Sequence, residues 1–318
     1  MNDISIIIPI YNESKTLKPL IDAIVAQTLL PREIIFVDSG SSDDSINIIT
    51  NYANTADSLL SIRTLLNTGG LPGGNRNKGI QEACSNWIAF LDAGLVPEKT
   101  WLENLMNYAR SNMQNAVYGL CQFDADMAFQ KAVCAISYGC GAFHPALPAS
   151  LFHRSVFESA GLFREDLRAT EDIVWLKKFE LIYGPRQVCN SALVYYRHFP
   201  TSAYQLMSKW WSYEKSAIRS GIVSAKILWF SLMLLAFIVT IIIYFPLMSI
   251  SLLASGITIR GIVSPMLRSR HWQWWGSTPY VTLIAIGACF ARDMTKLIAR
   301  AYYLFQMQSD NLSRRERA

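Results

Sequence analysis

The sequence predicts an α/β fold, with a Rossmann-like, mostly parallel sheet flanked by helices, followed by a C-terminal membrane-associated helical region. Three observations lead to this prediction. Short apolar runs alternate with segments of helical spacing in the first part of the chain, a pattern typical of βαβ units. Polar clusters follow these apolar runs. In the last third, residues 227–259 contain no charged side chain over 33 residues.

The alternation predicts four strands and three helices before residue 95. The strands are short β-branched runs, typical of buried parallel strands, at 4–10, 33–38, 60–66 and 87–92. Helices are expected at 16–27, where apolar residues share one face, at 44–53, where Ser and Asp are available as the N-cap, and at about 75–84, after a glycine-rich loop.

Beyond residue 100 the pattern is less regular. It predicts a helix at about 98–111 and a strand at about 116–122, then a loop over 139–150. A turn leading into a helix is expected around "EDIVWLKKFELIYG" (171–184), and a last strand in "VCNSALVYYRH" (188–198). No internal repeat and no low-complexity linker interrupts this order.

Four polar clusters, "YNES", "DSGSSDD", "NTGG" and "DAGLVP", come directly after predicted strands. Parallel strands present their carboxyl ends at one edge of a sheet, and ligands bind in the crevice beyond that edge. The sequence therefore predicts a ligand site there, built from four converging turns.

Composition separates the chain at residue 225. Residues 1–225 carry 19 basic and 21 acidic side chains, a net charge of −2, whereas residues 226–318 carry 10 basic and 3 acidic side chains, a net charge of +7. A basic C-terminal third next to an uncharged stretch favours contact with an anionic membrane surface rather than with nucleic acid. We expect one domain over 1–225 and a membrane region over 226–318.

Within the membrane region, 227–259 is too long for one span and too short for two full ones. Pro246 lies near its middle, which favours a hairpin of two short membrane helices; one long tilted helix with a broken second half is the alternative. Arg260, Arg268, Arg270 and the basic tail are then expected on the cytosolic side. Residues 279–305, with a polar stripe beside apolar residues, predict an interfacial amphipathic helix.

The N-terminus shows no basic segment followed by a long apolar run, so we expect no signal peptide and a cytosolic catalytic domain. The six cysteines have no CxxC spacing and are expected to be free and mostly buried thiols: Cys84, Cys121, Cys134, Cys140, Cys189 and Cys289.

Several side chains at the predicted carboxyl edge of the sheet can be interpreted in two ways. Asp38 could accept hydrogen bonds from a nucleobase or ribose, or cap the next helix. Arg76 or Lys78 could pair with a diphosphate. Asp92 could bind a divalent cation together with phosphate oxygens and water, or end its strand as a cap. The "ED" pair at 171–172 could hold a general base, or two first-turn acids favoured by the helix dipole.

The aromatic and basic segment 205–221, "QLMSKWWSYEKSAIRSG", also has two interpretations. One is an interfacial helix with an aromatic belt. The other is a platform for an acceptor sugar or a lipid phosphate, and both can hold at once.

Taken together and in this order, the motifs resemble those of glycosyltransferase family 2 enzymes with the GT-A fold, from about residue 4 to about residue 221. "SIIIPIYNES" resembles the opening strand of that family, and "IIFVDSGSSDDS" its "VDDGSxD" turn, with Ser39 where the second Asp often stands. "NTGGLPGGNRNKGI" resembles the "N-x-G…R-N-x-G" segment. "WIAFLDAGLVP" is similar to the strand that ends in the D-x-D motif, with Gly94 in place of the second acid, and "GLFREDLRATEDIVW" is similar to the acceptor segment.

The resemblance implies a role for each matching residue. Asp172 would be the catalytic base, and Asp92 would bind the metal, Mg²⁺ or Mn²⁺. Acceptor binding would involve Glu171, Gln205 and Trp210, the last two in a loose match to a "Q-x-x-R-W" motif. The residues implied in binding the nucleotide sugar are Pro9, Tyr11, Glu13, Asp38, Asn67, Arg76 and Asp92.

The function implied is that of an inverting glycosyltransferase, which moves a sugar from a nucleotide-sugar donor to a lipid-linked acceptor in polysaccharide or glycan assembly. The expected location is the inner membrane, with the catalytic domain on the cytoplasmic side, and the chain could form a homo-oligomer. Two alternatives stay open. One is transfer to a polyprenyl monophosphate, which needs no base. The other is a catalytically silent nucleotide-binding membrane subunit, which the missing acid at Gly94 favours.

Overall fold

The computed structural model describes residues 3–55, 60–223, 225–245, 250–251, 254–256, 258–269 and 279–315. The chain forms two compact units, and each is described by itself. The first comprises residues 1–123 and 143–197, and the second comprises residues 124–142 and 198–318. The predicted boundary at residue 225 stays a prediction; in the structure, the segment 198–225 belongs to the same unit as the C-terminal helix.

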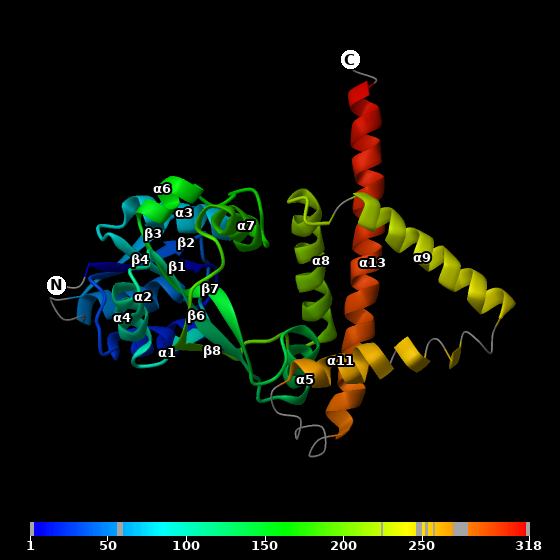
Figure 1. The fold of residues 1–318 in the computed structure, drawn as a ribbon, viewed down its shortest axis with the longest axis horizontal. Helices are drawn as coiled ribbons and strands as arrows, with labels where there is room; N and C mark the ends of the chain where they lie inside the picture. The colour runs from blue at the N-terminus through cyan, green and yellow to red at the C-terminus, as the bar shows by residue number, and fades with distance from the viewer. Residues whose placement is uncertain are drawn as a thin grey trace. The chain divides into compact units, whose positions relative to one another are not determined.

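The first unit is built on an eight-stranded sheet in the order β3-β2-β1-β4-β7-β6-β8-β5 (Figure 1). β1 pairs in parallel with β2 and β4, and β2 pairs in parallel with β3. β7 is antiparallel to β4, β5 is antiparallel to β8, and β6 is parallel to β8. The bounds are β1 Ile4–Ile10, β2 Glu33–Asp38, β3 Ser61–Leu66, β4 Trp87–Phe90, β5 Leu95–Pro97, β6 Ala116–Phe123, β7 Ala142–His153 and β8 Val188–Tyr196.

Helices cover both faces of this sheet, so it has two hydrophobic cores. Successive side chains of β1 point to opposite faces: Ile6 and Ile8 join one core and Ile7 joins the other. The first core is closed by α1 (Ser14–Val25), α2 (Ser45–Thr55) and α4 (Trp101–Ser111), and the second by α3 (Pro72–Glu82), α6 (Ser155–Ala160) and α7 (Glu171–Tyr183). This arrangement confirms the predicted α/β class.

The sequence prediction was wrong about the segment 139–150, which is not a loop. It contributes most of β7, whose pairing with β4 covers Leu151–His153. Pro145 and Pro148 made the segment resemble a loop because proline cannot donate a ladder hydrogen bond, but both lie outside this register. The short strand β5 and the helix α5 (Ala128–Ser137) were also missed.

The predicted glycine-rich loop is mostly helical. α3 begins at Pro72, within the first turn, where the missing N–H of proline costs no hydrogen bond. Its glycines allow close packing: a Cβ on Gly79 would lie 2.4 Å from Cγ2 of Ile7, and one on Gly73 would lie 2.1 Å from the carbonyl oxygen of Arg164. α3 can therefore lie directly against β1 and against the chain before α7.

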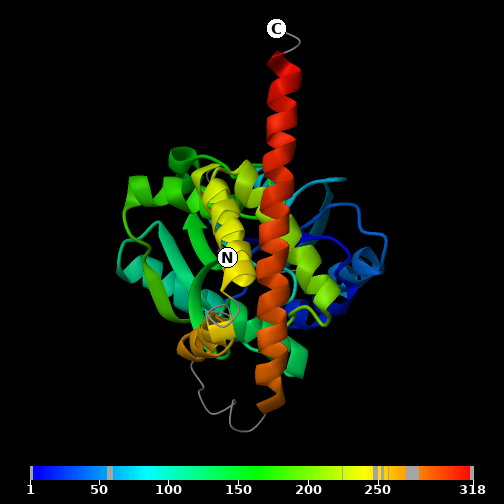
Figure 2. The ribbon, with the colours of Figure 1, turned by 90° about the vertical axis from the view of Figure 1, so that its right-hand side faces the viewer.

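The second unit is helical. Besides α5 it contains α8 (Ala203–Arg219), α9 (Ala225–Tyr244), the π-helical turn η1 (Ile259–Val263), α11 (Ser264–Arg268) and the 37-residue helix α13 (Pro279–Arg315), drawn orange to red in Figure 2. Among the residues that the structure describes, we found no helix both long enough and apolar enough to cross a membrane.

The predicted membrane hairpin over 227–259 is therefore not confirmed. α9 covers its first part, whereas Pro246, the proposed break, lies outside the described residues. Arg270 and residues 316–318 of the basic tail lie outside them as well.

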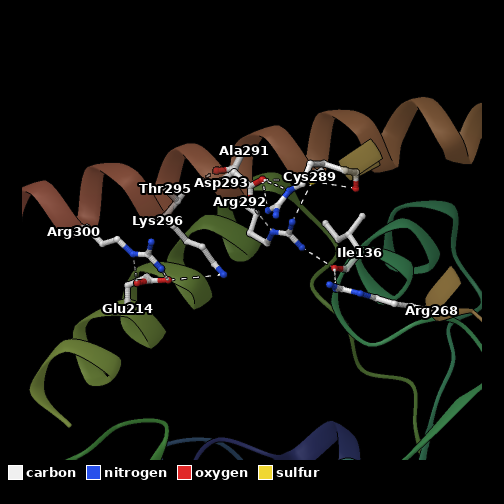
Figure 3. Close-up of polar contacts among 11 residues, drawn as sticks. Ile136, Glu214, Arg268, Cys289, Ala291, Arg292, Asp293, Thr295, Lys296 and Arg300 are labelled. Carbon is white, nitrogen blue, oxygen red and sulfur yellow. Dashed lines mark hydrogen bonds and ion pairs between the residues drawn. The ribbon is translucent and has the colours of Figure 1, made fainter. Parts of the chain in front are cut away.

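The amphipathic helix predicted over 279–305 is part of α13, but its polar stripe does not face water. Arg300 donates from Nε to Glu214 of α8 at 2.9 Å, and Arg292 donates to the carbonyl oxygen of Ile136 at 2.6 Å (Figure 3). Apolar side chains instead face outward, including those of Phe290, Ile298 and Phe305. Helical spacing predicted the two stripes correctly, but the polar stripe packs against α8 and α5 instead of facing water. The interfacial position of the helix stays a prediction.

We predict that Gly79→Ala destabilises the first unit, since the new methyl group would meet Ile7 at a distance that normal contacts never reach. Overpacking of this kind costs about 1–3 kcal/mol of unfolding free energy. Gly74→Ala is the matched control in the same helix, because its Cβ would meet no atom closer than 3.6 Å. The control is expected to keep or slightly raise the urea midpoint, followed by circular dichroism; equal losses in both variants would contradict the packing argument.

Candidate functional site

The loops after β1 and β2 are joined by hydrogen bonds at the carboxyl edge of the sheet. The backbone N–H of Asn12 donates to Oγ of Ser41 at 2.8 Å, and Oδ1 of Asn12 accepts from the N–H of Ser42 at 2.8 Å. The N–H of Glu13 donates to Oγ of Ser45 at 2.9 Å. Asn12 has a φ of 55°, a left-handed conformation that asparagine tolerates better than most residues. The predicted convergence of these two turns is confirmed.

Asp38 ends β2 at this edge and is almost fully buried. Its carboxylate accepts hydrogen bonds from the N–H of Ser41 at 3.0 and 3.1 Å and from Oγ of the same serine at 2.6 Å. These bonds close the turn after β2, whereas α2 begins only at Ser45, so Asp38 does not cap that helix in this structure. Its binding of a nucleobase or ribose stays a prediction. Of the other predicted donor-site residues, Pro9 lies in β1 opposite Val37, and Tyr11 is half exposed.

Asn67 is part of an amide network that joins the loops after β2 and β3. Its Nδ2 donates to Oδ1 of Asn75 at 2.8 Å, and Nδ2 of Asn75 donates to Oγ of Ser39 at 2.8 Å. The backbone N–H of Asn67 donates to the carbonyl oxygen of Asp38 at 2.7 Å. Asn67 and Asp38 are thus brought together, as predicted. Asn75 and Ser39 were not proposed, although both lie inside the motifs that the sequence analysis singled out.

The centre of the site is the guanidinium of Arg76, which is buried in α3. Nη2 donates to Oδ1 of Asp92 at 2.7 Å, and Nη1 donates to Oε1 of Glu171 at 2.6 Å. The guanidinium also lies over the ring of Phe163, 5.8 Å from its centroid. Arg76 thereby joins three segments that are far apart in sequence: α3, the turn after β4, and the start of α7. In this structure the guanidinium pairs with these two carboxylates, whereas the sequence interpretation was that Arg76 or Lys78 pairs with a diphosphate.

Asp172 follows Glu171 in the first turn of α7, where the helix dipole favours acidic residues. Desolvation raises the pKa of both carboxyls above their ordinary values, and the positive charge of Arg76 opposes this rise. The preceding residue, Thr170, has a φ of 71°, which is rare for a β-branched side chain. A strained backbone thus comes directly before two carboxylates of raised pKa, a combination that is common at functional sites.

Asp92 lies in the turn after β4, and its side chain is 43% exposed. The turn is closed by a hydrogen bond from the N–H of Leu95 to the carbonyl oxygen of Asp92. Gly94 within it has a φ of 88°, where an aspartate would be strained. The conformation of the turn therefore explains why glycine occupies this position.

A divalent cation fits this donor set only with ligands from outside the chain. The described part of the chain holds no group of three or more His, Cys, Asp and Glu side chains able to bind a metal ion. Asp92 supplies one carboxylate, one oxygen of which is already paired with Arg76. Phosphate oxygens and water would have to provide the remaining ligands, which is how proteins usually bind Mg²⁺.

Asn77 is a positioning residue that the sequence analysis did not single out. Its Nδ2 donates to the carbonyl oxygen of Phe163 at 2.9 Å and to Oε1 of Glu165 at 2.8 Å, while its Oδ1 accepts from the N–H of Phe163 at 2.9 Å. These bonds fix the segment "GLFRED" on α3. The adjacent "RN" pair thus serves two purposes, since Arg76 holds the carboxylates and Asn77 holds the chain before α7.

Gln205 and Trp210, the other predicted acceptor-binding residues, belong to α8 in the second unit. Oε1 of Gln205 accepts from the N–H of Thr201 at 2.9 Å. The ring of Trp210 lies below the amine of Lys296, with 4.0 Å between Nζ and the ring centroid. In this structure both side chains make contacts within their own unit, and their role in acceptor binding stays a prediction. The prediction of free cysteines is confirmed for all six, of which only Cys84 is exposed.

Comparison with known proteins gives a family match that lies mostly within the first unit. Residues 5–159 match the model described as glycosyl transferase family 2. A poly(ribitol-phosphate) beta-glucosyltransferase of Bacillus spizizenii is 33% identical over 119 residues, covering 36% of this chain and 18% of that protein. A cholesterol galactosyltransferase of Borreliella burgdorferi is 36% identical over 114 residues, covering 36% of this chain and 31% of that protein. The match thus spans less than a third of the length of either relative.

The fold has a counterpart among solved structures. A mannosyltransferase of Pyrobaculum calidifontis, in complex with GDP-Man and Mn²⁺, superposes with a TM-score of 0.58 at 17% identity, over 93% of this chain and 87% of that one. A mixed α/β sheet with flanking helices fits the GT-A fold, as predicted. The match of residues 5–159 to the glycosyl transferase family 2 model, together with the names of the relatives, supports a glycosyltransferase enzyme.

Proposed function

We propose that the chain is an inverting glycosyltransferase that moves a sugar from a nucleotide-sugar donor to a lipid-linked acceptor, with Asp172 as the general base. The observation that carries the proposal is the cluster around Arg76, where three carboxylates, one from the turn after β4 and two from the start of α7, gather beside one buried guanidinium. A cluster of perturbed acids next to the phosphate-facing edge of a GT-A sheet is typical of a catalytic site.

The chemistry is a single displacement. Asp172 accepts the proton of the acceptor hydroxyl while the hydroxyl oxygen forms a bond to the anomeric carbon of the donor. The bond from that carbon to the diphosphate oxygen breaks, and the nucleoside diphosphate leaves on the opposite face. One displacement inverts the anomeric centre. The raised pKa of Asp172 suits this role, because a stronger base takes the proton more readily.

Arg76 acts in this proposal by holding charges in place. It fixes Asp92 at the mouth of the site and Glu171 beside the base, so that Glu171 can orient the acceptor. Asp92 would hold a Mg²⁺ or Mn²⁺ ion together with the donor phosphates, and such an ion would stabilise the departing diphosphate. Asp38, Asn67 and the turn of Tyr11 and Glu13 would surround the nucleotide, which requires Asp38 to exchange bonds with Ser41 for bonds to the ligand.

A lipid acceptor at a membrane is supported by two observations. Residues 226–318 have a net charge of +7, which favours an anionic surface. One relative is named a cholesterol galactosyltransferase, and cholesterol is a lipid. We place the catalytic domain on the cytoplasmic side of the inner membrane, where the chain could form a homo-oligomer. Transfer to a polyprenyl monophosphate is the second candidate, because its acceptor oxygen is already ionised and needs no base.

Asp172→Asn tests the base directly. General-base catalysis contributes about 10²–10⁴-fold, so nucleotide release from UDP-, GDP- or dTDP-sugars with a lipid extract is expected to fall by that factor. Donor binding, measured by calorimetry, is expected to persist. Asp22→Asn on the outer face of α1 is the control and should keep full turnover.

Turnover that survives Asp172→Asn would contradict the role of Asp172 and favour the phosphate acceptor. Nucleotide binding without turnover in the unaltered chain, on every lipid tried and with either metal, would support the silent subunit instead.

The raised pKa of Asp172 predicts the pH dependence of the reaction. A base works only when ionised, so kcat/KM is expected to fall as the pH drops through the pKa of Asp172 in the free enzyme. Because that pKa is raised, the acidic limb should lie above the ordinary value of 3.8 for an aspartate. The measurement is kcat/KM from about pH 4 to pH 9. An acidic limb at or below the ordinary value would contradict the desolvated base.

Arg76→Gln removes the cation that the three carboxylates share. Loss of one partner of a buried ion pair costs about 3–5 kcal/mol. Because Arg76 lowers the pKa values of Glu171 and Asp172, both rise further in the variant, and the folded variant binds protons more tightly than the unfolded chain. The loss of unfolding free energy caused by the substitution is therefore largest at high pH, and it decreases as acidification neutralises the carboxylates.

The difference in Tm between the unaltered chain and Arg76→Gln should thus be larger at about pH 8 than at about pH 5.5. Arg164→Gln, which removes an exposed ion pair with Asp166, is the control and should cost about 0–1 kcal/mol. A deficit that stays constant with pH would show that Arg76 contributes packing rather than charge.

A further inference from the structure

A cavity lies between α8 and α13 in the second unit. Its volume is about 390 Å³, within the range of small-molecule sites. The residues that line it are Tyr204, Met207, Ser208, Trp211, Thr295 and Ile298. None of these residues is an Asp, Glu, Lys, Arg or His, and the surface that they present is mostly apolar. A ligand that fits this lining has no charged group inside the cavity.

The cavity is built on a fixed pair of helices. Next to it, Glu214 of α8 is 1% exposed and accepts from Nε of Arg300 at 2.9 Å, while the amine of Lys296 lies 3.8 Å from its other oxygen (Figure 3). Trp211 contacts the rings of Tyr302 and Tyr303 of α13, with centroids 5.6 and 6.0 Å apart. Ion pairs and aromatic contacts therefore join the two helices beside the cavity.

The cavity opens onto an apolar surface. Tyr204 and Ile298, which line it, are 77% and 60% exposed, and Tyr302 and Phe305 continue the exposed apolar stripe along α13. Exposed apolar surface also occurs on α9, where it is not confined to one face: Met233, Leu234, Leu235, Phe237, Ile238 and Val239 are all exposed. A helix that is apolar on every side needs an apolar medium around it, whereas a protein partner would cover one face.

We infer that this cavity, an open groove between α8 and α13, binds a hydrocarbon chain of an anionic lipid phosphate. The inference rests on the proposed function, because this lipid would be the acceptor or its carrier. The lining takes the apolar chain, and the net charge of +7 in residues 226–318 favours a phosphate head group over a neutral one. A second copy of the chain would supply apolar surface to the groove but would add like charge.

The test uses the full chain in detergent micelles and phosphatidic acid with dibrominated acyl chains, since bromine quenches nearby tryptophan fluorescence. Trp211 lines the groove, so Trp211→Phe is expected to remove the saturable part of the quenching. Met207→Asp and Ile298→Asp place a carboxylate in the apolar lining and should weaken binding about tenfold or more. Both native side chains are exposed, and the variants should therefore fold.

Leu283→Asp is the matched control, because Leu283 is an exposed apolar residue of the same helix that does not line the groove. Phosphatidylcholine with the same brominated chains should bind more weakly than phosphatidic acid, and inorganic phosphate should not compete. Equal quenching in all variants would overturn the inference. So would groove variants that change the oligomeric mass in light scattering while the lipid causes no quenching, because a second copy would then cover the groove.

The quenching assay needs no sugar donor. It therefore separates the inference from the proposed function. Lipid binding in the groove without turnover would contradict only the proposed function. Turnover on a lipid acceptor that is unaffected by Met207→Asp and Ile298→Asp would contradict only the inference about the groove.

Discussion

The first unit depends on one buried ion-pair cluster. Arg76 reaches from α3 to the turn after β4 and to the first residue of α7, and so joins segments separated by 16 and 95 residues in the chain. Burial of these charges is unfavourable unless they are paired, and the raised pKa of Glu171 is the sign of that cost. Nε of Arg76 and Oε2 of Glu171 are buried without a hydrogen-bond partner in the described structure. Buried unsatisfied atoms are few in native proteins, and a catalytic role is one explanation for them.

The sequence predicted the βαβ part of the fold well and the cluster only in part. Periodic apolar runs of ordinary length identify β1 to β3 and their helices, because local spacing decides which face is buried. The pairing of Arg76 with Asp92 and Glu171 is a long-range contact that spacing cannot show. β7 was missed because its two prolines carry a local signal that the tertiary structure overrides. For α13, spacing gives the stripes but not the surroundings of each stripe.

Gly94 shows how a backbone requirement and a chemical one compete at a single position. The turn after β4 brings Asp92 to Arg76 by using a left-handed residue, and glycine adopts that conformation without strain. A second acid at Gly94 would add a metal ligand but would have to adopt the same φ. The structure therefore has a well-placed Asp92 rather than a pair of carboxylates. Metal binding is then expected to depend on the phosphates of the bound nucleotide.

The second unit reverses the usual distribution of polar and apolar side chains. Glu214, Arg292 and Arg300 are directed inward between helices, while Ile298, Phe290 and Phe305 face outward. In water, ion pairs near a surface are worth little, because the solvent screens them. Beside a hydrocarbon medium the effective dielectric is lower, and the same pairs hold α8 and α13 together more strongly. The outward stripe would gain in the same transfer, since its apolar area would leave water. In the proposed lipid environment, the apolar stripe would thus gain from leaving water, and the ion pairs would tighten the helix pair that encloses the groove.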